Sequence, residues 1–417
     1  MITLALKSFR NRRFSTLLTI TSIALSVTLL LGVERIRKEA RTSFTNTSSG
    51  TDLIVGARSG PVQLLLYSVF RIGNATTNIS WASYKEIAGN PNVKWTIPIS
   101  LGDSHQGYRV MGTNTDYFEF FRFSGGRRLE LAEGARFQGV FEAVLGAEVA
   151  EKLNYGVGDP IIIAHGAGKV SFVEHDDKPF KVVGVLKKTG TPVDQTVHVF
   201  LEGVEAIHID WKDGAPIPGH SIAADDVLAM DLTPQAITAF LVGLKSRIAA
   251  FSVQRYVNEY TREPLLAILP GVALQELWDL IGIAEKALLA VSGFVVAVGL
   301  SGMLIALMTS LDERRREMAI LRSVGARPLH IFSLIVGEAA MLTVTGVIMG
   351  VCLLYVLLLI GRPIILTHFG LYISIGGIAL HELSLIALVC LAGFFIGLIP
   401  GYRIYRYSLA DGMIIRI

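Results

Sequence analysis

Residues 287–311 read ALLAVSGFVVAVGLSGMLIALMTSL, and residues 313–328 read ERRREMAILRSVGARP. A helix needs about 20 mainly apolar residues to cross the hydrocarbon core of a bilayer, and the first stretch reaches that length without any Asp, Glu, Lys, Arg or His. The second stretch is rich in arginine and glutamate, which are costly inside a bilayer. Together they predict a membrane-spanning helix followed by a charged segment at the membrane surface.

Three further apolar runs are long enough to span a bilayer. The chain is 51% hydrophobic and only 18% charged, whereas soluble domains carry about 25% charged residues. The sequence therefore predicts an α-helical membrane protein with four transmembrane helices. The third run exceeds one span, so we expect it to begin as an interfacial or cytoplasmic helix. The four runs are Ser15–Val33, Ala287–Leu311, Ile331–Ile360 and Ser384–Pro400.

Basic residues in the short loops indicate the orientation, because Lys and Arg accumulate on the cytoplasmic side. The flanks of the first run do not decide it, since both are equally basic, but the loop between the second and third runs is rich in arginine. The loop between the third and fourth runs has only Arg362. Both termini are therefore predicted to be cytoplasmic. The predicted order is 1–14 cytoplasmic N-terminus, 15–33 helix, 34–286 extracytoplasmic domain, 287–311 helix, 312–330 cytoplasmic segment, 331–360 helix, 361–383 outer loop, 384–400 helix and 401–417 cytoplasmic tail.

The first apolar run is interpreted as an uncleaved anchor. A cleaved signal peptide is the alternative, but the run is long for one and continues into Glu34-Arg35-Ile36-Arg37 without a small-x-small cleavage site. Cys352 and Cys390 both lie in predicted membrane helices, so the outer segment has no disulfide framework. The net charge of +3 comes from arginines flanking the membrane runs and gives no case for nucleic-acid binding.

The segment 34–286 is predicted to be a large mixed α/β extracytoplasmic domain inserted between the first two helices. Both of its ends turn amphipathic and helical, with Leu274, Leu277 and Trp278 at helical spacing before the second run. One interpretation is a pair of stalk helices, rising about 22 Å above the bilayer over 272–286 at 1.5 Å per residue. The other is that they pack on the base of the domain. Predicted strands are Trp95–Ser100, Tyr108–Gly112, Pro160–Ala164, Phe180–Leu186, Val197–Leu201 and Ile237–Leu244, and predicted helices are Ser80–Ala88 and Gly146–Leu153.

The apolar runs are poorly equipped for ion conduction or secondary transport, which need ionisable groups inside the bundle. Among the four runs only the third contains such a residue, Glu338, near its cytoplasmic start. This glutamate either binds an arginine of the charged segment or lies in the headgroup region, and the second placement is favoured. Small residues predict close helix packing instead, within the chain or between two copies: Gly346, Gly350, Gly393 and Gly397 form two small-xxx-small motifs.

The charged segment at 313–328 has its own helical pattern. Met318, Leu321 and Val324 repeat every three residues, Gly325 is suited to end a helix and Pro328 to begin the next. The pattern predicts a short amphipathic helix at the cytoplasmic surface. From the residues alone, a coupling element and an interfacial anchor held by arginines are equally compatible with it.

This segment resembles the E-R-x-R-E…G-A pattern of the MacB, LolC/LolE and FtsX group of ABC-transporter permeases. The N-terminal 5–13 stretch ALKSFRNRR before an apolar run, 144–153 VLGAEVAEKL with the later 180–186 FKVVGVL, and 400–412 are also similar to that family. The resemblance implies a bacterial inner-membrane permease working as a homodimer, with a periplasmic or outer-membrane partner. It also implies that a cytoplasmic ABC ATPase subunit binds ATP and Mg²⁺ and moves the outer domain. The residues implied to couple to that ATPase are Glu313, Arg316, Glu317, Met318, Leu321, Arg322, Val324 and Gly325.

The chain itself is predicted to be non-catalytic and to bind no cofactor. A P-loop requires G-x-x-x-x-G-K-[ST], and the nearest stretch, 166–170 GAGKV, lacks the leading Gly and the hydroxyl residue. The 219–223 stretch GHSIA is only a loose match to a nucleophile elbow, and 381–385 HELSL lacks the second histidine of a zincin helix. No catalytic residue is predicted.

Histidines in the outer segment leave one question open. His175 is followed by Asp176 and Asp177, and imidazole and carboxylate groups can bind zinc. No short, fixed ligand spacing accompanies them, so they are weak candidates and no metal site is predicted. Three alternative functions follow from these observations: an FtsX-like transducer that activates an extracytoplasmic enzyme, a component of zinc uptake, and a scaffold.

Overall fold

The computed structural model describes residues 13–47, 50–166, 173–212, 215–216, 222–313, 320, 323, 325–369 and 376–410. The chain divides into two compact units. We call them the helical unit, formed by 1–39, 282–368 and 373–417, and the sheet domain, formed by 40–281 and 369–372. Each is described below by itself.

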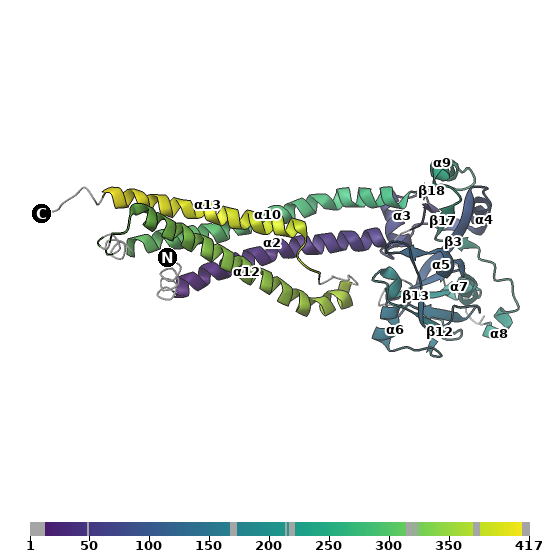
Figure 1. Cartoon of the computed structure of the whole chain (residues 1–417). Helices are drawn as coiled ribbons and strands as arrows, with labels where there is room; N and C mark the ends of the chain where they lie inside the picture. The colour runs from purple at the N-terminus through teal and green to yellow at the C-terminus, as the bar shows by residue number, and fades with distance from the viewer. Residues whose placement is uncertain are drawn as a thin grey trace. The chain divides into compact units, whose positions relative to one another are not determined.

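Four long helices dominate the helical unit, and each is long and apolar enough to cross a membrane (Figure 1). The four predicted apolar runs fall inside them, so the prediction of four membrane-length helices is confirmed. The third of these helices begins at Pro328, before the predicted run, and extends beyond its end. The helices are α2 (Arg13–Asn46), α10 (Pro270–Glu313), α12 (Pro328–Phe369) and α13 (Leu380–Ala410).

The helical unit has an apolar interior to which all four helices contribute. Val27 of α2, Met303 of α10, Leu342 of α12 and Val389 of α13 are buried in one cluster. Large apolar side chains also face outward, among them Phe294, which is 74% exposed. An apolar exterior around an apolar interior is the arrangement expected of helices surrounded by lipid.

A polar cluster joins helices at one end of this unit, and we call it the polar cap. Arg35 of α2 forms a buried ion pair with Glu382 of α13 at 3.7 Å. The same guanidinium donates a hydrogen bond to the carbonyl of Gly376 at 2.5 Å and lies over the ring of Tyr355 on α12. The Tyr355 hydroxyl donates to that Gly376 carbonyl as well. These contacts connect α2, α12 and α13.

A second set of charges connects α10 to the polar cap. Arg37 donates hydrogen bonds to Glu34 at 2.7 and 3.0 Å and pairs with Glu285 of α10 at 3.4 Å. His381 at the start of α13 lies 3.4 Å from Glu34. All four helices are therefore held together by polar contacts at the same end.

Glycines allow close contact between helices at the predicted positions. A Cβ atom at Gly346 would lie 2.7 Å from Ile23 of α2, and one at Gly350 would lie 2.7 Å from the carbonyl oxygen of Ala24. The Thr28 side chain donates a hydrogen bond to the Gly350 carbonyl, so α2 and α12 lie close together here. On α13, a Cβ atom at Gly393 would clash with Thr343 of α12, and one at Gly397 would clash with Ala339 of α12.

We expect Gly350→Leu to lower the thermal stability of the detergent-solubilised chain markedly, because its side chain would push α2 away from α12. Overpacking of a close contact typically costs 1–3 kcal/mol. Gly337→Leu is the matched control, since Gly337 lies exposed on the same helix and a Cβ there would meet nothing within 4 Å. Equal melting temperatures for the two variants, measured by circular dichroism, would contradict this packing.

The sheet domain is built on one mixed sheet whose main path is β18-β1-β17-β3-β4-β13-β8-β12-β7. Two pairs in it, β13 with β4 and β12 with β8, are parallel, and the others on this path are antiparallel. The path strands are β18 (Leu265–Ile268), β1 (Leu53–Ala57), β17 (Ala239–Leu244), β3 (Val93–His105), β4 (Tyr108–Thr113), β13 (Thr196–Phe200), β8 (Glu142–Leu145), β12 (Phe180–Leu186) and β7 (Leu131–Gly134). The other strands are β9 (Pro160–Ile161), β10 (Ala164–His165), β11 (Val173–Glu174), β2 (Ile79–Ser80), β16 (Ala236–Ile237), β5 (Arg122–Phe123), β6 (Arg127–Arg128), β14 (Trp211–Lys212) and β15 (Ala215–Pro216).

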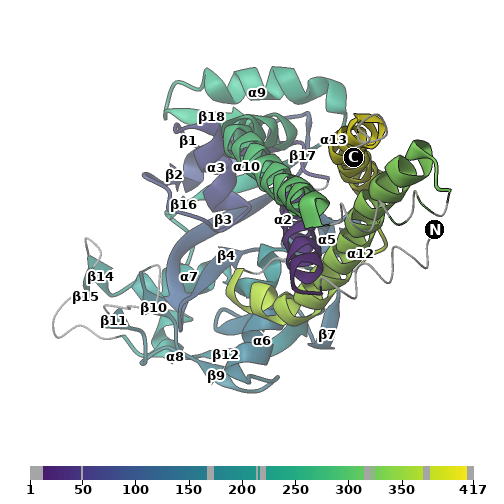
Figure 2. The same cartoon turned by 90° about the vertical axis from the view of Figure 1, so that its left-hand side faces the viewer.

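Helices cover both faces of this sheet, and successive side chains of a strand point to opposite faces, so both faces are buried. In β1, Ile54 joins the cluster that contains Leu64 and Leu65 of α3, whereas Leu53 and Val55 join the one that contains α4 and α9. Figure 2 shows α9 running alongside β18, which it contacts. The helices are α3 (Pro61–Ser68), α4 (Trp81–Ala88), α5 (Asp116–Phe120), α6 (Ala147–Leu153), α7 (Leu201–His208), α8 (Ala224–Val227) and α9 (Ala250–Asn258), with 3-10 turns η1 (Pro192–Gln195) and η2 (Arg247–Ala249).

The predicted elements correspond well to this domain. The strand at Phe180–Leu186 is found with the predicted bounds, and the helices predicted at Ser80–Ala88 and Gly146–Leu153 are α4 and α6. The stretch predicted as Pro160–Ala164 is instead two short strands, β9 and β10, that pair with different neighbours. A continuous apolar spacing cannot reveal that change of partner.

The first turns of α10 pack on the sheet domain. Ala273, Leu274, Leu277 and Trp278 belong to the domain's largest buried cluster, and Arg41 of α2 lies over the Trp278 ring. These turns therefore pack on the base of the domain, which is the second of the two interpretations given above. The helix then continues without a break to Glu313.

Candidate functional site

Two imidazoles and a carboxylate meet in the sheet domain. Asp103 lies near the end of β3, His165 on the short strand β10, and His208 is the last residue of α7. β10 pairs antiparallel with β3, with His165 directly opposite Asp103. Directly opposed residues of an antiparallel pair place their side chains on the same face. Helix α7 contacts β3 and contributes His208. We call these three residues the donor cluster.

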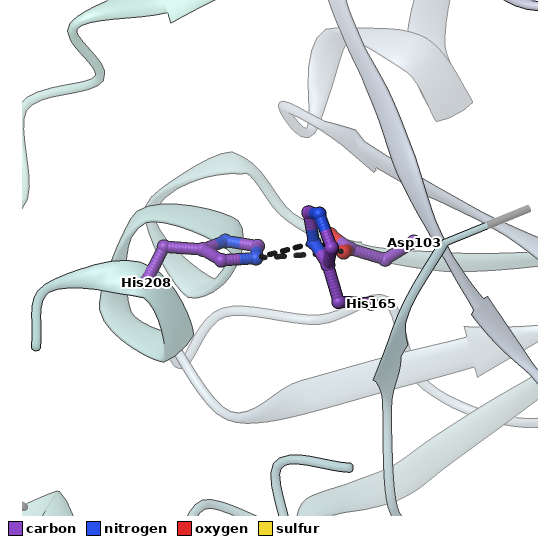
Figure 3. A group of neighbouring side chains, drawn as sticks. All are labelled: Asp103, His165 and His208. Carbon is purple, nitrogen blue, oxygen red and sulfur yellow. Dashed lines mark hydrogen bonds and ion pairs between the residues drawn. The ribbon is translucent and has the colours of Figure 1, made fainter. Parts of the chain in front are cut away.

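The three side chains point their polar atoms at one another, as Figure 3 shows. Nδ1 of His165 is 3.2 Å from Oδ1 of Asp103 and 3.2 Å from Nε2 of His208. Nε2 of His208 is 3.5 Å from the same Asp103 oxygen. One oxygen and two nitrogens therefore converge on a small volume.

Burial differs among the three residues. The side chain of Asp103 is only 4% exposed, whereas that of His165 is 39% exposed. The cluster thus has a buried, fixed end and a side open to solvent.

The charges of the cluster stabilise one another. Burial alone raises the pKa of Asp103, but the hydrogen bonds from His165 and His208 outweigh it and lower that pKa to about 2. Burial lowers the pKa of His208, and the hydrogen bond to Asp103 reverses this so that the net pKa is raised. The carboxylate is therefore ionised at neutral pH, which leaves it able to bind a cation.

A third imidazole, that of His175, lies beside the cluster. Its ring centroid is 5.0 Å from that of His208 and 4.7 Å from that of Trp211, and its Nε2 atom is buried without a hydrogen-bond partner. Burial and the neighbouring His208 lower its pKa to about 4. His175 is therefore neutral at physiological pH and keeps a free nitrogen lone pair close to the donor cluster.

The two aspartates that follow His175 are not members of the donor cluster. Asp176 is exposed, and Asp177 accepts a hydrogen bond from Lys178 at 2.6 Å. Lys178 also binds Asp210 at 2.8 Å. Of the weak metal candidates His175, Asp176 and Asp177, the structure places only His175 next to other metal-binding groups.

The sequence analysis missed the donor cluster because its members are far apart in the chain. Asp103 and His165 are separated by 62 positions, and His165 and His208 by 43. No ligand spacing of a few residues could reveal them, and only the pairing of β10 with β3 brings them together. The histidine content of the outer segment was the one available signal.

The predicted ATPase-coupling residues lie mostly outside the described part of the chain. Glu313 is the last residue of α10, and Gly325 has a φ of 95°, the left-handed conformation typical of a helix end. Ile320 is 64% exposed among the described residues of this segment. The remaining coupling predictions, at Arg316, Glu317, Met318, Leu321, Arg322 and Val324, fall on residues that the structure does not describe.

Family models match most of the chain. Residues 16–239 match the MacB-like periplasmic core domain, which is more than half of the sequence, and residues 289–409 match the FtsX-like permease C-terminal region. The chain belongs to the family of FtsX-like permeases with a MacB-like periplasmic core domain. The resemblance inferred from the charged segment is thereby confirmed.

Individual relatives are distant. The macrolide export ATP-binding/permease protein MacB of Nitrobacter winogradskyi is 24% identical over 422 residues, which cover 95% of this chain and 57% of the relative. The pyoverdine export ATP-binding/permease protein PvdT of Pseudomonas fluorescens is 24% identical over 315 residues, 74% of this chain and 43% of the relative. The chain spans about half the length of the curated relatives it matches.

Two solved structures show limited similarity to parts of this chain. The periplasmic region of MacB from Actinobacillus actinomycetemcomitans has a TM-score of 0.33 and 13% identity, covering 55% of this chain and 94% of that chain. The extracellular domain of the ABC-type transporter YknZ from Gram-positive bacteria has a TM-score of 0.31 and 14% identity, covering 52% and 99%.

Proposed function

We propose that this chain is the permease subunit of a MacB-like ABC complex in a bacterial inner membrane. In this proposal, ATP binding and hydrolysis in the cytoplasm drive movement of the sheet domain outside the membrane. The observation that carries it is the joint match to both family models, over 16–239 and 289–409, in a chain with four membrane-length helices.

ATP and Mg²⁺ are bound by an ABC ATPase subunit and not by these 417 residues. The sequence contains no G-x-x-x-x-G-K-[ST] motif, without which a P-loop cannot cradle phosphates. The permease therefore contributes no catalytic group, and the free energy of ATP reaches it through protein contact. The charged segment around Glu317 to Val324 is the proposed contact.

The proposed orientation places the charged segment and both termini in the cytoplasm. The arginine-rich loop between α10 and α12 supports it through the positive-inside rule. Two copies of the chain form the working unit, each bound to one ATPase subunit. The sheet domain then lies in the periplasm, where it meets a periplasmic or outer-membrane partner.

Movement of the sheet domain is the proposed output of the cycle. Helix α10 is one unbroken helix. Its first turns contain Leu274 and Leu277, which are buried in the sheet domain, and the rest contains the apolar span of the helical unit. A rigid helix can pass a tilt from one end to the other. The predicted spans contain only Glu338 as an ionisable residue, which favours mechanical transmission over a polar path for substrate through the helices.

The interface with the ATPase is tested by Met318→Asp combined with Leu321→Asp. We expect this double variant to abolish co-purification of the ATPase subunit, because two charges on the apolar face cannot be buried without partners. The measurement is a mild-detergent pull-down of the tagged chain from its host, with mass spectrometry of the bound proteins and an ATPase assay.

The matched control is Ala319→Asp combined with Ser323→Asp, which adds the same charge on the opposite face of the expected helix. We expect this control to retain the ATPase. If the Met318/Leu321 variant also retains it, the proposed interface is wrong. If even the unmodified chain brings down no P-loop ATPase, the ABC assignment itself fails.

A further inference from the structure

We propose that Asp103, His165 and His208 form an exchangeable binding site for a divalent transition-metal ion, with Zn²⁺ as the best match. This inference goes beyond the proposed function, because coupling to an ATPase requires no metal in the sheet domain. It rests on the geometry, the chemistry and the surroundings of the donor cluster.

The spacing of the three donor atoms matches a tetrahedral zinc site. Ligands at the usual zinc distances of about 2.0–2.1 Å lie about 3.3–3.4 Å from one another in a tetrahedron. The three separations here are 3.2, 3.2 and 3.5 Å. An ion can therefore bind all three atoms with little movement of the side chains.

His208 is oriented as metal-binding histidines usually are. Its Nδ1 atom lies 2.8 Å from the carbonyl oxygen of Val204, one turn back on α7, so that this nitrogen carries the proton and donates it. When a metal ion replaces the proton on Nε2, the lone pair left on that atom faces Asp103 and His165. A backbone carbonyl that fixes the tautomer and direction of the ring is a common second-shell partner of a metal-bound imidazole.

Without a metal ion, the cluster is held together by protons, since Nδ1 of His165 and Nε2 of His208 both lie within 3.5 Å of Oδ1 of Asp103. The neighbouring cation Lys178 is engaged by Asp177 and Asp210. A divalent ion would satisfy all three donors at once.

The donor types select the class of ion. Two imidazole nitrogens and one carboxylate oxygen suit Zn²⁺ and neighbouring transition metals, whereas Ca²⁺ and Mg²⁺ prefer sites built from oxygen alone. Three protein ligands leave a fourth position for water or for the ligand of a partner. Such open sites contrast with the four-ligand sites of structural zinc.

The surroundings favour exchange of the ion. The half-exposed His165 leaves one side open to solvent, and Trp211 packs against both histidines, with ring centroids 5.0 and 5.2 Å away. The buried clusters of the sheet domain are built from apolar side chains. The sheet domain thus has large apolar cores of its own, and we expect it to fold without the metal and to exchange the ion through the open side.

The test uses the full chain in detergent, purified with a Strep tag in place of a histidine tag and stripped with EDTA. ZnCl₂ is added, and bound zinc is measured by equilibrium dialysis with elemental analysis and by calorimetry. We expect one zinc ion per chain, and at least about 100-fold weaker binding for Asp103→Asn and for His165→Gln. His330→Gln, an exposed histidine of the helical unit, is the matched control and should bind like the unmodified chain.

Two further readouts separate coordination from a loss of folding. Substitution with Co²⁺ should give the strong visible absorption of a tetrahedral site, and Cu²⁺ should quench the fluorescence of nearby Trp211. His165→Gln changes a half-exposed side chain, so it should keep the melting temperature of the metal-free protein while losing both signals. Trp211→Phe should lose the quenching and keep the zinc.

The proposal is overturned if the unmodified chain binds no zinc above the level of His165→Gln, or if Asp103→Asn and His165→Gln retain full affinity. Retained affinity would mean that zinc binds elsewhere. Because the permease is assayed alone, these outcomes do not depend on recovery of the ATPase. Failure of the metal site and failure of the ABC assignment are therefore distinguishable.

Discussion

Glu382→Ala is expected to lower the free energy of unfolding of the helical unit by about 3–5 kcal/mol, the range for removing one partner of a buried ion pair. The substitution leaves Arg35, whose side chain is 7% exposed, with a buried positive charge. It also removes the carboxylate oxygen that accepts a hydrogen bond from the backbone of Ala379 at the start of α13 at 2.9 Å. The fall in stability should appear in an SDS titration followed by far-ultraviolet circular dichroism.

A double variant tests whether the unpaired charge is responsible. Arg35→Met combined with Glu382→Leu removes both charges and keeps apolar volume, so it should be more stable than Glu382→Ala alone. Replacement of a buried pair by apolar residues is often neutral. Glu276→Ala removes an exposed carboxylate from α10 and should change stability little. A double variant no more stable than Glu382→Ala would show that the charge pair is not what joins α2 to α13.

The membrane helices could be predicted from the sequence because their signal is local. An apolar run such as 287–311 is visible without knowledge of any other part of the chain. The polar cap could not be predicted, since Arg35 and Glu382 simply flank two different runs. Their pairing depends on which helices are neighbours, and that depends on contacts such as Gly350 against Ala24.

The sheet domain shows the same limit. Phe180–Leu186 alternates buried and more exposed residues, so its pattern indicates a strand directly, whereas β1 is buried throughout and carries no alternation. Strand order and the parallel pairs involve distant segments. The donor cluster also depends on contacts between distant segments. The pairing of β10 with β3 brings His165 next to Asp103, and His208 lies at the end of helix α7.

The sheet domain is expected to lose stability as the pH falls below about 6.5, and His198 is a main cause. This side chain is fully buried, its Nδ1 atom lies 3.2 Å from the carbonyl oxygen of Val144, and its ring stacks on Tyr117 at a centroid distance of 5.3 Å. Burial, together with the positive charge of Arg71, lowers its pKa to about 3. The folded domain therefore holds His198 neutral.

The direction of the effect follows from proton binding. In the unfolded chain, histidine has a pKa of about 6.5, so below that pH the unfolded state binds a proton that the folded state does not. Stability is fully present above pH 6.5 and falls as the pH decreases toward the folded pKa. Between pH 7 and pH 5 this one residue should lower the free energy of unfolding by about 2 kcal/mol.

His198→Phe removes the titrating group and keeps an aromatic ring of similar size, so it should lessen the pH dependence even if it lowers stability at pH 7. Tryptophan fluorescence during urea unfolding is the suitable measurement, because Trp81, Trp95, Trp211 and Trp278 all lie in the sheet domain and report on it alone. His330→Gln, in the helical unit, is the control and should keep the original slope. His175, whose pKa is also lowered, should leave a residual dependence in the Phe variant. A slope unchanged by His198→Phe would mean that this histidine is not held neutral in the folded domain.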